Sequence, residues 1–161
     1  MNGPLEIVIL EDDARRRGAM RTALEERLPQ YPPRFFTTAP EAARYLQDHL
    51  DRALLIVLDH DLDPIPVHPR RSLDPGTGRD VADFLAARKP VCPVVIHSTN
   101  RPAVVGMQTE LAEAGWDVRV VVPYGDLEWI DVEWRQAVRD AVVAAAQPAA
   151  ESATAPVVAA A

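Results

Sequence analysis

The chain has 161 residues, with very little cysteine and very little lysine. Cys92 is the only cysteine, which excludes an internal disulfide and a zinc site built from several cysteines. This composition fits a reducing compartment, so we expect the protein in the cytoplasm. Lysine occurs once, at Lys89, although lysine and arginine together number 17. Arginine therefore carries almost all of the positive charge.

The chain also lacks an excess of positive charge and any long hydrophobic run. Its formal net charge is -7, which argues against bulk electrostatic binding to nucleic acid or to an anionic membrane, since both need a basic face. No segment approaches the roughly 20 apolar residues of a membrane span. The first residues show no basic segment followed by a long apolar one, so we expect no signal peptide. A small phosphate ester, or a single nucleic-acid end that enters a pocket, remains possible as a partner.

What the sequence does have is an alternation of short apolar runs with helical patterns. Apolar runs predict buried strands at residues 6–10, 54–58, 94–96 and 118–122, and residues 34–38 predict a shorter strand. Helical patterns occupy residues 14–28, 41–50, 79–89, 102–114 and 126–146. The alternation implies a flavodoxin-like α/β fold, with a five-stranded parallel sheet in the order 2-1-3-4-5 and helices on both faces.

Two segments fall outside this alternation. Residues 62–78 hold four prolines and no periodic pattern, so we expect an irregular loop there, and long loops in compact domains are often functional. Residues 147–161 are rich in Ala and have no apolar stripe to bury, which predicts a disordered tail. The folded domain is therefore expected to span residues 1–146.

Acidic residues follow two strands that the predicted order places side by side. Glu11 and Asp12 come directly after the first strand, and Asp59 and Asp61 come at the end of the third. Ligands bind in such sheets at the carboxyl ends of the strands, where the strand order reverses. Carboxylates packed together repel one another and lose hydration, and a divalent cation removes that penalty. The four carboxylates therefore predict a metal site, and their oxygen ligands favour Mg²⁺.

Each of these acidic groups also has a structural interpretation. Glu11, Asp12 and the following Asp13 can form a solvated turn in which Asp13 caps the next helix. Asp61 can cap a loop. The convergence of both groups at one edge of the sheet favours the metal site.

Histidines stand at the same strand ends. His97 ends the fourth strand, and His60 follows Asp59 directly. Imidazole titrates near neutral pH, so both histidines are candidates for moving a proton at a bound phosphate. His60 is also a candidate metal ligand, and imidazole ligation would favour Mn²⁺ or Zn²⁺ over Mg²⁺. The alternative for each is a hydrogen-bonded structural histidine.

A polar segment follows His97. Ser98, Thr99 and Asn100 offer hydroxyl and amide groups to phosphate oxygens, and Arg101 offers a positive charge. The same residues can instead form a turn before the next helix, with a solvated arginine. Both interpretations place the segment at the carboxyl edge of the sheet.

Over roughly residues 5–145 these motifs resemble the receiver domains of response regulators. The run Ile9-Leu10-Glu11-Asp12-Asp13 resembles the acidic end of the first receiver strand, and Asp59 falls at the phospho-acceptor aspartate. Gly78 resembles the glycine that opens the third helix. Ser98 matches the small hydroxyl residue that ends the fourth strand, and Pro123 matches the proline after the lysine of the fifth.

The chain departs from ordinary receivers in an informative way. Val122 occupies the lysine position, and Lys89 closes the third helix at the other end of the sheet. The segments Asp59-His60-Asp61-Leu62 and Ile96-His97-Ser98-Thr99-Asn100 are foreign to ordinary receivers. They resemble a divergent branch, the cyclic-phosphate processing receiver-like domains. This resemblance implies chemistry on cyclic phosphates of nucleotides or RNA ends.

Three functions are therefore compatible with the sequence. The first is a metal-dependent cyclic phosphodiesterase that uses Asp59, His97 and His60. The second is an atypical stand-alone receiver phosphorylated on Asp59. The third is a pseudo-receiver that binds a protein partner through the face made by helix 102–114, the fifth strand and the last helix.

Overall fold

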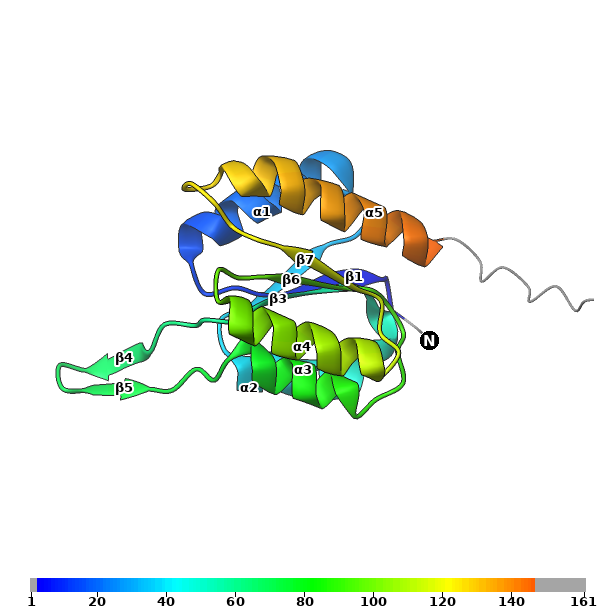
Figure 1. The fold of residues 1–161 in the computed structure, drawn as a ribbon. Helices are drawn as coiled ribbons and strands as arrows, with labels where there is room; N and C mark the ends of the chain where they lie inside the picture. Colours follow the sequence, from blue (N-terminus) through cyan, green and yellow to red (C-terminus); the bar gives the residue numbers. More distant parts are fainter. Residues whose placement is uncertain (1–2, 147–161) are drawn as a thin grey trace, which may run out of the picture.

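The computed structural model describes residues 3–146 and shows a parallel sheet between two layers of helices (Figure 1). The sheet has the order β2-β1-β3-β6-β7, which is the predicted order 2-1-3-4-5 when only its own five strands are counted. The flavodoxin-like fold is confirmed. The strands of the sheet are β1 (Glu6–Leu10), β2 (Pro33–Phe36), β3 (Ala53–Asp59), β6 (Val94–His97) and β7 (Val118–Val121).

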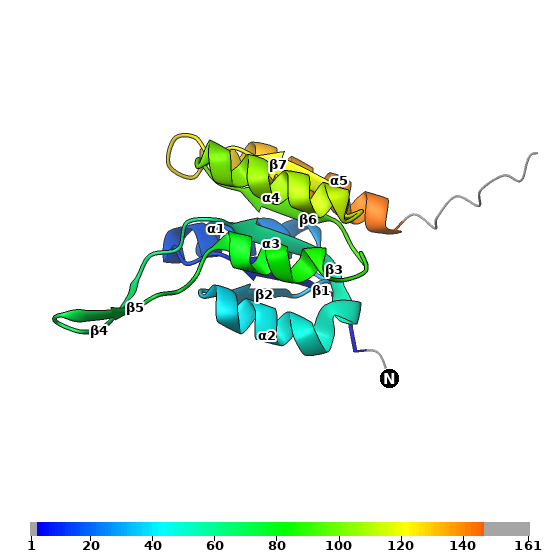
Figure 2. The same ribbon diagram turned by 60° about the horizontal axis from the view of Figure 1, so that its bottom comes forward.

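Helices cover both faces of the sheet (Figure 1, Figure 2). One face carries α1 (Ala14–Arg27) and α5 (Arg135–Ala146); the other carries α2 (Ala39–His49), α3 (Gly78–Ala86) and α4 (Arg101–Glu113), with the short 3-10 helix η1 (Leu50–Arg52) after α2. In β1, Ile7 and Ile9 pack toward α1 and α5, whereas Val8 and Leu10 pack toward the other layer. Burial on both sides explains why β1 reads as a continuous apolar run.

Local signals fix several helix ends. The Asp13 carboxylate caps α1 by accepting a hydrogen bond of 2.8 Å from the backbone N–H of Arg16. Pro40 lies in the first turn of α2, where its missing N–H costs no hydrogen bond. Gly115 follows α4 with a φ of 88°, a conformation that favours glycine. Because of these signals, the helix ends predicted from the sequence lie close to those in the structure.

The segment predicted as an irregular loop is partly regular. Strands β4 (Ile65–His68) and β5 (Arg71–Leu73) pair antiparallel and form a ribbon that projects from the body of the domain (Figure 1, Figure 2). The prediction was wrong because prolines hide the strand pattern, and an exposed two-stranded ribbon tolerates Pro66 where a central strand would not. The ribbon leaves and rejoins the domain between β3 and α3, at the carboxyl edge of the sheet.

The last helical segment differs from the single helix predicted for residues 126–146. A π-helical turn, η2 (Ile130–Trp134), precedes α5. Trp129 and Trp134 are both fully buried and belong to the core. Among the described residues, no helix is long and apolar enough to cross a membrane. The tail predicted at residues 147–161 lies outside the described part of the chain.

Candidate metal and phosphate site

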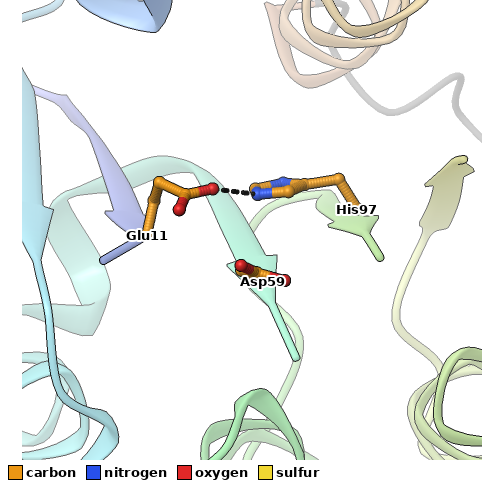
Figure 3. A group of neighbouring side chains, drawn as sticks. All are labelled: Glu11, Asp59 and His97. Carbon is orange, nitrogen blue, oxygen red and sulfur yellow. Dashed lines mark hydrogen bonds and ion pairs between the residues drawn. The ribbon is translucent and has the colours of Figure 1, made fainter. Parts of the chain in front are cut away.

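Three buried polar side chains meet at the carboxyl edge of the sheet (Figure 3). Glu11 directly follows β1, Asp59 is the last residue of β3, and His97 is the last residue of β6. Leu10 pairs with Leu58, so Glu11 and Asp59 are the next residues of neighbouring strands, and Asp59 pairs with His97. The residues are 0%, 3% and 0% exposed, respectively. Strand register alone therefore assembles the group.

Glu11 orients the imidazole of His97. The Nε2 atom of His97 lies 2.9 Å from Oε2 of Glu11, and Oε1 of Glu11 accepts a hydrogen bond of 2.9 Å from the backbone N–H of Asp13. The ring of Trp129 packs against the imidazole, with 5.3 Å between the ring centroids. Nδ1 of His97 is buried and has no hydrogen-bond partner among the described residues. Nε2 is thus the nitrogen that faces the Glu11 carboxylate and the one placed to reach a cation bound there.

The two carboxylates differ in their electrostatics. Burial raises the pKa of Asp59 to about 6; the charge of Glu11 also raises it, while His97 and Arg16 oppose the shift. Burial also raises the pKa of Glu11, but the hydrogen bond from His97 and the N–H of Asp13 outweigh it, so the net shift is downward. Asp59 is thus the group that gains most from a neighbouring cation.

The cluster has the chemistry of a divalent metal site. One ligand atom from each of Glu11, Asp59 and His97 lies within 4.8 Å of the others. Two carboxylates and an imidazole are suitable ligands for Mn²⁺ or Zn²⁺, and the carboxylates also suit Mg²⁺. The residues present therefore fit a divalent cation.

A pocket of about 200 Å³ opens at Asp59. Its wall is polar and mainly acidic, and it is made by Asp12, Asp13, Arg16, Asp59, Asp61, Asp63, Ser98, Thr99 and Pro123. Glu11 and His97 are not among these lining residues. A larger cavity of about 410 Å³ lies between α1 and the η2–α5 segment, with walls that are largely apolar. Only the smaller pocket adjoins the buried cluster.

The predicted metal ligands occupy different depths in this site. Asp12 is half-buried on the pocket wall, and its carboxylate accepts a hydrogen bond of 2.6 Å from the backbone N–H of Asp63. Burial, as the largest cause, raises the pKa of Asp12. The Asp61 side chain is 60% exposed at the rim and contacts His60 Nδ1 at 2.8 Å and Asn100 Nδ2 at 3.4 Å. The structure therefore groups Glu11 with Asp59 and leaves Asp61 outside the buried cluster.

The four predicted phosphate-binding residues also occupy different positions relative to the pocket. Ser98 is buried, Thr99 is exposed, and both line the pocket. Asn100 caps α4, because its side-chain oxygen accepts a hydrogen bond of 3.3 Å from the backbone N–H of Ala103. Arg101 is exposed in the first turn of α4 and does not line the pocket.

Gly78 fits the start of α3 tightly against the end of β3. Its backbone N–H donates a hydrogen bond of 3.0 Å to the carbonyl oxygen of His60. A Cβ atom at this position would lie 2.1 Å from the backbone carbonyl oxygen of Asp59, which is far inside contact distance. Only glycine allows this approach, so the glycine that opens α3 helps to hold Asp59 in place.

The sequence interpretation missed Arg16, which lines the pocket. Its Nη1 atom lies 3.6 Å from Oδ2 of Asp59 and 3.8 Å from Oε2 of Glu11. The available signal was its position in the first helical turn after the acidic run, where an arginine is unfavourable without a local reason.

The family model of the cyclic-phosphate processing receiver domain matches residues 7–113, about two thirds of the chain. The chain belongs to this family. The match includes all three residues of the buried cluster. No curated protein matches the chain.

Solved receiver structures share the fold of this family member. The phosphorylated cyanobacterial phytochrome response regulator RcpA is 18% identical, with a TM-score of 0.65 over 92% of this chain and 100% of that one. A receiver domain from Rhodospirillum rubrum is 19% identical, with a TM-score of 0.58 over 83% and 90%. The Mn²⁺-bound form of response regulator Rcp1 is 19% identical, with a TM-score of 0.56 over 85% and 93%.

Proposed function

We propose that this receiver-like domain holds a divalent cation and opens cyclic phosphate esters, such as the 2′,3′-cyclic phosphates of nucleotides or RNA ends. The observation that carries the proposal is the buried Glu11–Asp59–His97 cluster beside a polar pocket. Membership of the family supports the substrate class. The Mn²⁺ bound by Rcp1, which shares the fold, supports a divalent cation.

Glu11, Asp59 and His97 would hold the cation, which is Mg²⁺, Mn²⁺ or Zn²⁺. When bound, the cation neutralises the carboxylates and polarises a phosphate oxygen. Asp12 lies on the pocket wall, where its carboxylate can hold a water molecule. His97 is fully buried and does not line the pocket, so a ligand or orienting role suits it better than direct proton transfer to a substrate.

Ring opening adds water to phosphorus and breaks the bond from phosphorus to one ribose oxygen. The attacking water loses a proton, and the leaving ribose oxygen gains one. Ser98 and Thr99 line the pocket, and a hydroxyl group can donate to a phosphate oxygen. His60 does not line the pocket, but its Nδ1 contacts the carboxylate of Asp61, which does, so the Asp61–His60 pair would supply the proton to the leaving oxygen.

The direct test is to incubate the protein with a 2′,3′-cyclic nucleotide and Mg²⁺ or Mn²⁺ and to follow ring opening by phosphorus NMR. We expect turnover that needs metal, that is lost in Asp59→Asn and His97→Gln, and that persists in His49→Gln. His49 is a suitable control because it stacks on Tyr45 at the opposite end of the domain. The proposal fails if neither metal supports ring opening, or if His97→Gln is as fast as the parent.

The same protein should then be exposed to a small acyl phosphate. A gain in mass of one phosphoryl group that disappears in Asp59→Asn, without ring opening, would replace the hydrolase with an atypical receiver. If neither chemistry occurs and no metal response depends on Asp59, only a protein-binding role remains.

A further inference from the structure

Three consecutive arginines, Arg15, Arg16 and Arg17, follow Ala14 at the start of α1, one residue after the acidic run. The N-terminal turn of a helix carries partial positive charge, so cations are unfavourable there and acidic residues are preferred. This first turn contains no acidic residue. Each arginine therefore needs a partner that offsets its position, and the structure gives the three arginines different surroundings.

Two of these arginines are fully engaged with neighbouring protein groups. Arg15 is exposed and makes paired hydrogen bonds to Asp126, one of them 3.2 Å long. Arg17 reaches back to the backbone, where its Nη1 donates to the carbonyl oxygens of Glu11 and Asp12. Neither arginine lines the pocket at Asp59. Their roles are explained by the connections they make.

Arg16 differs because its guanidinium makes no hydrogen bond with another described residue. Its distances of 3.6 Å to Asp59 and 3.8 Å to Glu11 are ion-pair distances beyond hydrogen-bond reach. The side chain is 33% exposed, and its guanidinium carbon lies 5.8 Å from the ring centroid of Trp129. A cation is thus held against an aromatic ring with its N–H donors free to bind a ligand.

The pocket shows what these donors would bind. Arg16 is the one basic side chain on the described wall, where it stands with the hydroxyl residues Ser98 and Thr99. No other basic side chain takes this place. Arg101, the cation expected from the sequence, does not line the pocket. Val122 stands where receivers have their lysine. A planar guanidinium that offers two parallel donors matches the oxygens of a phosphate group.

We propose that Arg16 is the phosphate-binding cation of this pocket. Its guanidinium binds two non-bridging oxygens of the phosphate, while Ser98 and Thr99 contact the phosphate from the end of β6. Arg16 then supplies, from the first turn of α1, the positive charge that is missing after β7, where Val122 stands in place of the receiver lysine. The phosphate ester as substrate rests on the proposed function, whereas the binding of a phosphate group by Arg16 does not.

Inorganic phosphate is the probe, titrated by calorimetry into the Mg²⁺-saturated protein and its variants. We expect Arg16→Ala to weaken phosphate binding about 10- to 100-fold, since hydrogen bonds to charged groups are among the strong ones. Arg16→Lys should restore only part of the affinity, because an ammonium group lacks the planar fork. Arg15→Ala, one residue away, is the matched control and should bind phosphate like the parent.

A second titration separates phosphate binding from simple neutralisation of the buried carboxylates. Without phosphate, Arg16→Ala should bind Mg²⁺ at least as tightly as the parent, because the variant loses a positive charge next to the metal. If Arg16→Ala lowers the melting temperature and weakens Mg²⁺ binding while phosphate affinity is retained, the role is structural and the proposal is overturned. Failure of the parent to bind phosphate overturns it as well. Because inorganic phosphate is not a substrate, these results stand whether or not cyclic phosphates are opened.

Discussion

Two buried glutamates at opposite ends of β1 show how differently one residue type is used in this domain. Glu6 begins the strand and is 2% exposed, while Glu11 follows its end and is 0% exposed. Glu6 accepts hydrogen bonds from the Tyr45 hydroxyl and, at 2.9 Å, from Nε of Arg34, and Arg52 lies 3.8 Å away. Burial raises the pKa of Glu6, but these donors outweigh it and lower the pKa overall.

The buried charge of Glu11 is less well compensated by its neighbours than that of Glu6. Asp59 lies beside it with a raised pKa of about 6, one nitrogen of His97 has no partner, and Arg16 stays beyond hydrogen-bond distance. Burial of a carboxylate is therefore not the mark of function in this fold. The feature that indicates a functional site is a second buried carboxylate beside the first, with too few hydrogen-bond donors for both and an adjoining pocket.

The largest difference between Glu6 and Glu11 is expected in divalent metal affinity when one carboxylate at a time is removed. Glu11→Gln should weaken Mn²⁺ binding by about 100-fold or more, because a ligand is lost. Glu6→Gln should leave the affinity within about twofold, as its surroundings hold no metal site. Equal losses in isothermal titrations of the two variants would mean that the two ends do not differ as described.

A second prediction concerns stability without metal. Above pH 6 Asp59 is ionised in the folded protein, where burial makes its charge less favourable than in the unfolded chain. Asp59→Asn should therefore raise the free energy of unfolding by about 2–3 kcal/mol at pH 7. The raised pKa means that this gain builds up from about pH 4 to pH 6 and vanishes below pH 4. Urea unfolding across this range, with a chelator present, measures it. A destabilised Asp59→Asn at pH 7 would contradict the account.

Glu6 should behave in the opposite way. Its lowered pKa gives stability that is present above about pH 4.5 and is lost as the pH falls through the folded value. Glu6→Gln should cost about 2 kcal/mol at pH 7, since it leaves the donors of Arg34 and Tyr45 without their charged acceptor. The same urea titrations test this, and an unchanged stability of Glu6→Gln would show that the hydrogen bonds from Tyr45 and Arg34 do not stabilise the fold.

The smallest effect is expected at the rim. Asp61 is 60% exposed, and solvent screens its charge, so Asp61→Asn should change Mn²⁺ affinity by less than about threefold. A larger change in the same titration would extend the metal site outward to a residue that the structure leaves outside the buried cluster.

Much of the fold follows from the sequence, because doubly buried strands leave a strong signal. The alternation of apolar runs with helical patterns was sufficient to predict the sheet order, and the acidic residues at two strand ends predicted the meeting of Glu11 with Asp59. The ribbon of β4 and β5 was missed because an exposed hairpin buries no face and so leaves no periodic pattern. The π-helical turn at Ile130–Trp134 was missed for a different reason, because its residues also fit an α-helical spacing.

The site residues at strand ends could be predicted from the sequence, whereas those on helices and loops were harder to predict. The strand order placed Glu11, Asp59 and His97 at one edge of the sheet without a structure, but it predicted His97 as a proton-transfer residue and not as a member of the metal cluster. Arg16 lies on a helix, and its direction depends on how α1 packs against Trp129, which no local pattern encodes. The depth of Asp61 and the exposure of Arg101 likewise depend on loop and helix placement.

A crystal structure of the protein soaked with Mn²⁺ and phosphate, with the metal located by anomalous scattering, tests the metal site directly. We expect one Mn²⁺ ion bound by carboxylate oxygens of Glu11 and Asp59 and by a nitrogen of His97, with phosphate in the adjoining pocket. An ion bound only by exposed carboxylates such as Asp61 and Asp63, or none at all with the Glu11–His97 contact unchanged, would contradict it.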